Sequence, residues 1–155
     1  MTVYQRILLA VDLTEESEYL GGKARELAGA LGAQLELLHV VEPVPPVVTA
    51  GPEAVPIAMP TTDELIDTAR AALQKLAQEL RVAEDRSSIE VGTTRTEIIR
   101  VARARKMDLI VVGAHERHAL AFLFKRTEDA VLHRAPCDVL AIRMPRVEDS
   151  KKSVI

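Results

Sequence analysis

The chain has 155 residues, which is about the size of one domain. Its 20 basic and 23 acidic residues nearly balance, so no strong overall charge favours nucleic acid or an anionic membrane as a partner. With an aromatic content of 3% and no Trp, the chain also lacks the stacking residues that bind single-stranded nucleic acid.

No apolar run reaches the roughly 18 residues of a membrane span, and the N-terminus leads into an expected strand without a signal sequence. The single cysteine, Cys137, forms no internal disulfide and agrees with a reducing compartment. We therefore expect a cytoplasmic protein. We interpret Cys137 as a small apolar residue at the start of a strand, in preference to a reactive thiol, because no base lies beside it in the sequence.

The first half of the chain predicts a strand, a helix and a second strand. Residues 3–11 favour a strand and are continuously apolar from Ile7, as in a strand buried on both faces. After Asp12, Thr14 is the expected cap of a helix that ends at Gly32. Residues 35–41 form the second expected strand. A strand, helix and strand of this length favour a right-handed crossover in a parallel sheet.

A proline-rich segment follows, since residues 42–60 hold six of the eight prolines. Proline lacks the backbone N–H that regular structure needs, so we expect a long loop. Two interpretations stay open, a lid over a binding site and a variable surface connection.

The second half of the chain predicts three helices and three strands. Thr61 with Glu64, and Thr94 with Glu97, each match a capping box at a helix start. The first of these helices should end near Val82 and the second at about Lys106. The other expected elements are a half-exposed edge strand at 88–92, a buried strand at 109–113, a helix that ends before Pro136, a strand at 138–143 and a polar, disordered tail at 146–155.

The element order is therefore β-α-β-loop-α-β-α-β-α-β, with five mostly apolar strands and four helices. This pattern predicts a single α/β domain over residues 1–145, with a doubly wound parallel sheet. In such a sheet, ligands bind at the carboxyl ends of the strands.

Five segments together resemble the universal stress protein family across almost the whole chain. They are I-L-L-A-V-D at 7–12, L-L-H-V-V at 37–41, V-G-T-T-R-T-E-I-I at 91–99, D-L-I-V-V-G-A-H at 108–115 and V-L-H-R-A-P-C-D-V-L at 131–140. The resemblance implies a Rossmann-like fold of the adenine nucleotide alpha hydrolase type with strand order 3-2-1-4-5. It also implies that Asp12 and Gly113 face each other across a crevice.

In nucleotide-binding members, the resemblance implies that Asp12 contacts the adenosine side and that the Val41 backbone contacts adenine. The phosphates would lie on a loop of pattern G-x2-G-x9-G-(S/T) after the fourth strand. Here Gly113 is kept, Glu116 stands at the second glycine, and Arg126 followed by Thr127 stands at the third. A second alignment counts backward from A-P-C-D-V-L. In that alignment the loop is one residue short, and Lys125-Arg126 stands in place of the Gly-Ser pair.

Loss of these glycines is expected to weaken nucleotide binding, because other residues do not let backbone amides approach phosphate oxygens as closely. Arg117, Lys125 and Arg126 can still meet an anion through their side chains, and Thr127 can cap a helix start. Against this, Glu128 and Asp129 would already neutralise that helix end. The candidate nucleotide site is therefore Asp12, Val41, Gly113, Arg126 and Thr127 in a degenerate loop.

Two hypotheses of function follow. The first is a non-enzymatic, dimeric stress-response protein that acts through protein contacts and needs no cofactor. The alternative is an ATP- or AMP-binding switch with slow or no hydrolysis. An unrelated α/β enzyme is a weaker third possibility, for which no catalytic residue can be named.

Other polar residues are interpreted as structural and not as parts of a binding or catalytic site. His115, Glu116 and His118 lack the spacing that puts two histidines on one helical face, so no metal site is predicted. His39, inside an apolar strand, is interpreted as a satisfied core or rim histidine. The basic residues of the helix at 94–106 are interpreted as a solvated surface, with an acidic protein partner as the sharper alternative. They are Arg95, Arg100, Arg103, Arg105 and Lys106.

The last strand predicts a homodimer. In the order 3-2-1-4-5 it is an edge strand, yet Val139, Leu140 and Ile142 are apolar and no inward charge or central proline protects it. The family resemblance also implies pairing of fifth strands across a two-fold axis, which closes at two subunits.

Overall fold

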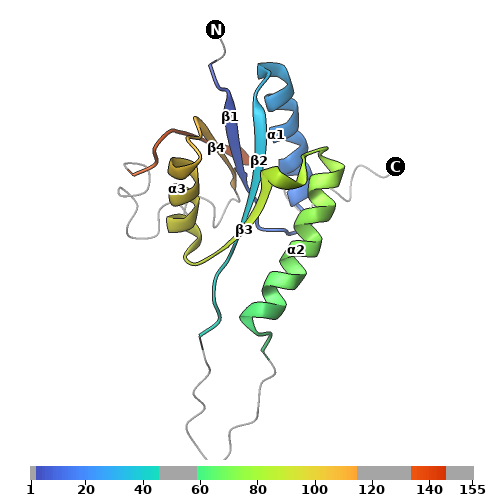
Figure 1. The fold of residues 1–155 in the computed structure, drawn as a ribbon. Coiled ribbons are helices and arrows are strands. Elements are labelled where there is room, and N and C mark those ends of the chain that lie inside the picture. The colour runs from blue at the N-terminus through green and yellow to red at the C-terminus, as the bar shows by residue number, and fades with distance from the viewer. Residues whose placement is uncertain (1–2, 46–58, 115–133, 146–155) are drawn as a thin grey trace, which may run out of the picture.

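The computed structural model describes residues 3–45, 59–114 and 134–145 of the chain (Figure 1). Its elements are β1 Arg6–Ala10, α1 Ser17–Leu31, β2 Gln34–Val41, α2 Thr62–Glu79, a 3-10 turn Glu84–Arg86, β3 Ser87–Val91, α3 Thr94–Ala104, β4 Leu109–Ala114 and β5 Asp138–Arg143. The expected fourth helix, most of the proline-rich loop and the tail lie outside the described residues.

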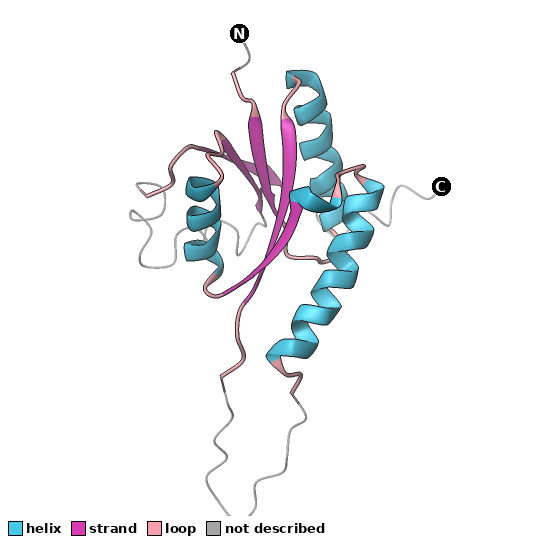
Figure 2. Cartoon of the chain, viewed as in Figure 1, coloured by secondary structure: helices cyan, strands magenta, loops and turns pink. Residues whose placement is uncertain are grey.

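All five strands form one parallel sheet in the order β3-β2-β1-β4-β5, which confirms the predicted order. Figure 2 shows α1 and α2 on one face of this sheet and α3 on the other. In the part of the chain that the structure describes, no helix is long and apolar enough to cross a membrane.

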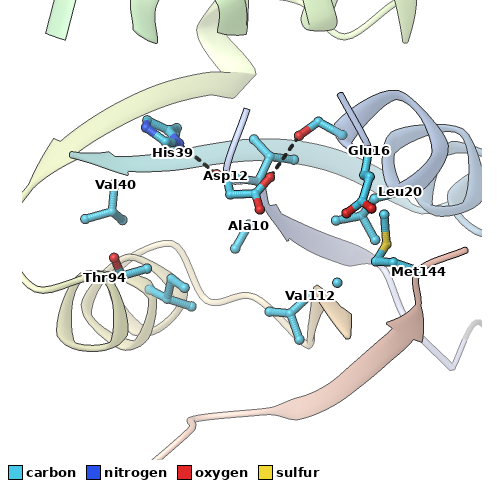
Figure 3. A pocket seen from close by; sticks show the side chains of 13 residues that line it. Ala10, Asp12, Glu16, Leu20, His39, Val40, Thr94, Val112 and Met144 are labelled. Carbon is cyan, nitrogen blue, oxygen red and sulfur yellow. Dashed lines mark hydrogen bonds between the residues drawn. The ribbon is translucent and has the colours of Figure 1, made fainter. Parts of the chain in front are cut away.

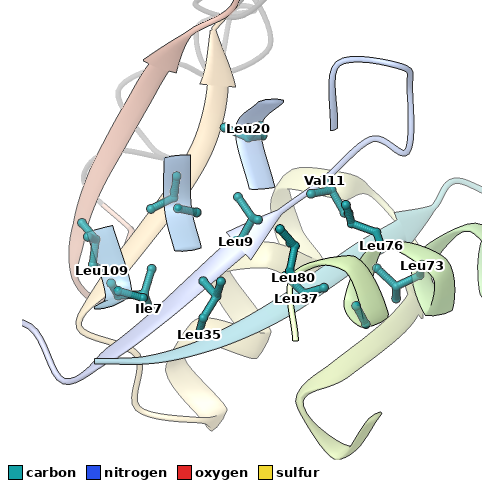
Figure 4. Packing of buried hydrophobic residues seen from close by; sticks show 14 of the residues in the cluster. Ile7, Leu9, Val11, Leu20, Leu35, Leu37, Leu73, Leu76, Leu80 and Leu109 are labelled. Atoms are coloured by element: carbon teal, nitrogen blue, oxygen red, sulfur yellow. The ribbon is translucent and has the colours of Figure 1, made fainter. Parts of the chain in front are cut away.

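The core has two parts, one on each face of the sheet, and β1 contributes to both. Leu9 and Leu37 lie in the part covered by α1 and α2 (Figure 4). Leu8 and Leu38 lie in the part covered by α3. Ile7, Leu8 and Leu9 are fully buried, which confirms the prediction of a first strand buried on both faces.

The predicted start of α1 is wrong. The helix begins at Ser17, and Glu16 in the N-cap position makes no side-chain cap bond. Thr14 is not a cap because its hydroxyl and its amide both donate to Asp12. The predicted end is confirmed, since Gly32 adopts a left-handed conformation with φ of 64° that glycine adopts without strain.

The two predicted capping boxes have different outcomes. The box at α2 is confirmed, because Thr61 accepts from the Glu64 amide and the Glu64 side chain accepts from the Thr61 amide. The box at α3 is wrong, since the N-cap residue is Thr93 and makes no side-chain cap bond. Glu97 accepts from Arg100 instead.

Both helices end slightly before their predicted ends. Arg81, two residues beyond α2, and Lys106, two beyond α3, adopt positive φ values of 54° and 53°. The amide that follows each of them bonds back to a carbonyl of the last helical turn, at Ala77 and Ala102. These are left-handed helix ends of the kind that glycine usually forms, without a glycine to signal them in the sequence.

The interpretation of the basic residues at 94–106 as a simple solvated surface is wrong for Arg105. Arg105 lies 3.1 Å from the carboxylate of Glu36, which is 5% exposed and is also bonded by Arg6 at 2.7 Å. Arg100 lies 2.6 Å from both Glu90 and Glu97. Arg105 ties the end of α3 to β2, because the buried carboxylate of Glu36 requires a paired charge. Arg100, which is half exposed, links α3 to β3 at the surface.

The two threonine N-caps allow a matched test. Thr61→Ala should lower the free energy of unfolding by about 1 kcal/mol, because a capping bond is lost. Thr93→Ala should change it by less than about 0.5 kcal/mol, because no such bond exists at that position. Urea denaturation of both variants measures the difference. Equal losses would contradict the assignment of the two caps.

Candidate functional site

A cavity of about 280 Å³ lies at the carboxyl ends of β1, β2 and β4 (Figure 3). In the strand order β3-β2-β1-β4-β5, the direction in which strands are added reverses between β1 and β4. Such a point of reversal leaves a crevice at the carboxyl ends of the strands. The apolar part of its wall comes from seven residues: Ala10, Val11, Leu20, Val40, Ile98, Val112 and Met144.

Asp12 lies at the rim of this cavity, two residues after the end of β1. Its Oδ1 accepts from the Thr14 amide at 3.2 Å, the Thr14 hydroxyl at 2.8 Å and the Ser17 hydroxyl at 3.2 Å. Between them Leu13 adopts a φ of 59°, which is unusual for a residue with a side chain. The three bonds to Asp12 hold this turn, and Oδ2 takes part in none of them.

His39 lies on β2 beside Asp12 in the cavity wall (Figure 3). Its Nδ1 is 2.8 Å from the carbonyl oxygen of Val11. A carbonyl only accepts, so Nδ1 must carry the proton, and Nε2 of the neutral ring is an acceptor. This bond confirms the interpretation of a satisfied rim histidine.

Glu42 holds the start of α3. Its Oε1 accepts from the Thr94 amide at 3.1 Å and from the Thr94 hydroxyl at 2.8 Å. These bonds, the amide bond first, hold the pKa of the Glu42 carboxyl below its ordinary value of 4.5. The carboxylate therefore closes the positive end of α3, where Thr94 lines the cavity.

Gly113, near the end of β4, lies where the wall is tightest. A Cβ at this position would be 3.2 Å from the Met144 sulfur and 3.4 Å from Leu20 Cδ2. The structure therefore needs a small residue here for space.

The structure brings two of the five candidate nucleotide residues together, since Asp12 and Gly113 line the same cavity. Val41 is buried beside it, with its carbonyl accepting from the Gly92 amide at 3.0 Å, and its neighbour Val40 lines the wall. Arg126 and Thr127 lie outside the described residues. The nucleotide roles of all five stay predictions.

Sequence reasoning did not assign His39, Thr94 or Met144 to this cavity, and it did not find Glu42. Glu42 and Thr94 are 52 positions apart, so only the strand order shows that they meet. The one signal in the sequence that could have identified Glu42 is a carboxylate directly after a buried strand. That signal was used only for Asp12.

The remaining candidate residues either have a structural role or lie outside the described residues. Cys137 packs against the α3 side of the core, and burial, with the negative charges of Asp108 and Asp138, raises the pKa of its thiol. His115, Glu116 and His118 lie outside the described residues. Within the described ranges, no three His, Cys, Asp or Glu side chains are grouped to hold a metal ion.

Comparisons with known proteins agree on one family. Residues 3–143 match the model of the Universal stress protein family. The chain is 36% identical over 145 residues to Universal stress protein A homolog 2 of Coxiella burnetii, covering 93% of this chain and 98% of the relative. It is 31% identical over 142 residues to a Thermus aquaticus universal stress protein, covering 91% and 100%. The chain belongs to the universal stress protein family.

Solved structures share the fold. Universal stress protein UspA from Lactobacillus plantarum superposes with a TM-score of 0.64 at 24% identity, covering 90% of this chain and 98% of that one. An Archaeoglobus fulgidus universal stress protein in complex with dAMP gives 0.57 at 19%, covering 92% and 99%. A universal stress protein in complex with cAMP gives 0.58 at 21%, covering 90% and 96%.

The Glu42 bonds predict a pH-dependent contribution to stability. Because the folded pKa is lowered, the contribution is present above pH 4.5 and is lost as the pH falls through the folded value. Glu42→Ala should therefore destabilise the protein by about 1 kcal/mol at pH 7, the usual cost of a lost cap, with solvent screening at this exposed site limiting the effect. Denaturation at pH 7 and at acidic pH measures it.

Glu42→Gln is the control for this prediction, because its amide oxygen can still accept both bonds but does not titrate. Its loss of stability should be smaller and should not change across the same pH range. A Glu42→Ala effect that stayed constant down to the lowest pH at which the protein folds would contradict the assignment.

Gly113→Ala should destabilise the protein by about 1 kcal/mol, because the added methyl crowds Met144 and Leu20. Gly29 in α1 is the matched control, since a Cβ there meets nothing within 4 Å. Gly29→Ala should stabilise by about 0.5 kcal/mol through helix propensity. Thermal denaturation of the pair measures both, and stabilisation by both substitutions would contradict the tight packing at Gly113.

Proposed function

We propose that this chain is a non-enzymatic universal stress protein that acts in the cytoplasm as a homodimer, through protein contacts, with weak or no ATP binding. The observation that carries the proposal is a family framework that matches over residues 3–143, combined with a phosphate loop in which Gly113 alone of the three glycines is kept.

The charge of the described cavity wall supports this proposal. Asp12 and Glu16 line it, and no Lys or Arg from residues 3–45, 59–114 or 134–145 does so. A triphosphate brought against the Asp12 carboxylate loses electrostatic free energy unless cations compensate.

The rival proposal is an ATP- or AMP-binding switch. It is supported by the position of the cavity at the strand reversal, with Asp12 and Gly113 both in its wall. Universal stress proteins of similar fold have been solved with cAMP and with dAMP, which makes an adenine nucleotide the ligand of this proposal. On this proposal Arg126 and Thr127 would meet the phosphates through side chains.

Titration calorimetry with Mg-ATP and with AMP separates the two proposals. We expect no binding in the micromolar range for the unmodified protein. The double variant Glu116→Gly, Arg126→Gly restores the glycine pattern and should bind ATP at least tenfold more tightly than the parent, because backbone amides could then approach the phosphates. Micromolar affinity in the unmodified protein would favour the switch.

The proposed dimer forms through the edge strand β5. In the described part of the sheet β5 pairs with β4 alone, and Leu140 on it is 38% exposed. Ile142 packs partly against one part of the core and Val139 against the other. An apolar edge of this kind favours pairing with a second copy.

Leu140→Lys should shift the protein from dimer to monomer, because it places a charge in the proposed interface, while helix content stays unchanged. Val91→Lys is the matched control, since Val91 is 46% exposed on the opposite edge strand β3. It should leave the dimer intact. Sedimentation and circular dichroism measure both properties, and an unmodified protein that is monomeric at micromolar concentration would refute the dimer.

A further inference from the structure

The side-chain hydrogen-bond donors in the described cavity wall are all engaged within the protein. The Ser17 hydroxyl donates to Asp12, and the Thr94 hydroxyl and amide donate to Glu42. The Nδ1–H of His39 donates to the carbonyl of Val11. A ligand in this cavity therefore finds no free donor among these side chains.

The acceptors at the same rim are less fully used. Oδ2 of Asp12 takes part in none of the three bonds that fix Oδ1. Nε2 of His39 is left as an acceptor once Nδ1 carries the proton. Asp12 gives the rim negative charge, and His39 lies near it because its Nδ1 bonds to the carbonyl of Val11, the residue before Asp12. The polar end of the site thus suits a ligand that brings donors and positive charge.

The rest of the cavity is apolar. Val40 from β2, Ile98 from α3 and Val112 from β4 meet there, and Leu20 and Met144 line the wall near Gly113. A volume of about 280 Å³ is near the lower end of the range for small-molecule sites. Burying a hydrocarbon body against these side chains supplies affinity that the polar rim alone would not.

We propose that this cavity binds a small amphipathic amine, with its ammonium group at Asp12 and its apolar body between Val40, Ile98 and Val112. An ammonium carries three donors, no acceptor and one positive charge, which complements the acceptors at the rim. A hydroxyl brings one donor and no charge, and a carboxylate brings acceptors and repulsion. This ligand class goes beyond the proposed function, which makes no statement about amines.

The test is an amide NMR titration of the full chain with three ligands of matched shape: phenethylamine, 2-phenylethanol and phenylacetate. Phenethylamine should bind at least threefold more tightly than the alcohol, with phenylacetate weakest, and its shifts should fall on residues of the cavity wall. Equal binding of alcohol and amine, or tighter binding of phenylacetate, would overturn the proposal. Adenosine is a fourth ligand, and its binding more tightly than the amine would also overturn it.

Asp12→Asn tests the residue that receives the ammonium. It should reduce the preference for amine over alcohol to about one, while binding of the alcohol changes less than twofold. Asp67→Asn is the matched control, because Asp67 is 78% exposed on α2, where it pairs with Arg70 at 3.7 Å. It should leave the preference unchanged, and a preference that persists in Asp12→Asn would overturn the assignment.

Asp12 also holds the turn before α1, so the unmodified protein provides a second measurement in case Asp12→Asn does not fold. Added salt should weaken phenethylamine binding and leave 2-phenylethanol binding almost unchanged, because salt screens only the charged interaction. An amine affinity that salt does not change would contradict the role of charge. Because ATP binding is measured separately, failure of the amine titration leaves the conclusion on ATP standing.

Discussion

The central constraint in this molecule is the burial of β1 on both faces. β1 pairs in parallel with β2 and with β4, and Leu8 and Leu9 point into opposite parts of the core. After Arg6 the strand carries only apolar side chains, and the first polar side chain beyond it is Asp12, two residues after Ala10. The position of the crevice and of its acidic rim both follow from that packing.

The crevice has a recurring local arrangement. Twice, a carboxylate that follows a buried strand accepts hydrogen bonds from both the hydroxyl and the amide of a threonine. Asp12 after β1 accepts from Thr14 in the turn before α1, and Glu42 after β2 accepts from Thr94 at the start of α3. In each case the bonds fix a turn or a helix start against the sheet. The same bonds engage hydroxyl and amide donors of Thr14 and Thr94 within the protein.

Much of the fold was predictable from the sequence because its signals are local. Apolar runs found the strands, and Thr61 with Glu64 found the start of α2. The predicted helix caps at Thr14 and Thr94 are both wrong for the same reason. In each case the threonine hydroxyl donates to a carboxylate, whereas the local rule assigned it to the helix cap. For Thr94 that carboxylate is 52 positions away, and the presence of His39 and Met144 in the same cavity also depends on strand order, which local patterns do not encode.

The central claim is that this crevice keeps the position of a nucleotide site but not its preference for phosphate. Native mass spectrometry of the protein, purified without added ligand, tests it most directly, because it reports whatever molecule the crevice retains. We predict the mass of two chains without ATP or AMP, either with no ligand or with a small cationic ligand. ATP or AMP bound at one molecule per chain would contradict it.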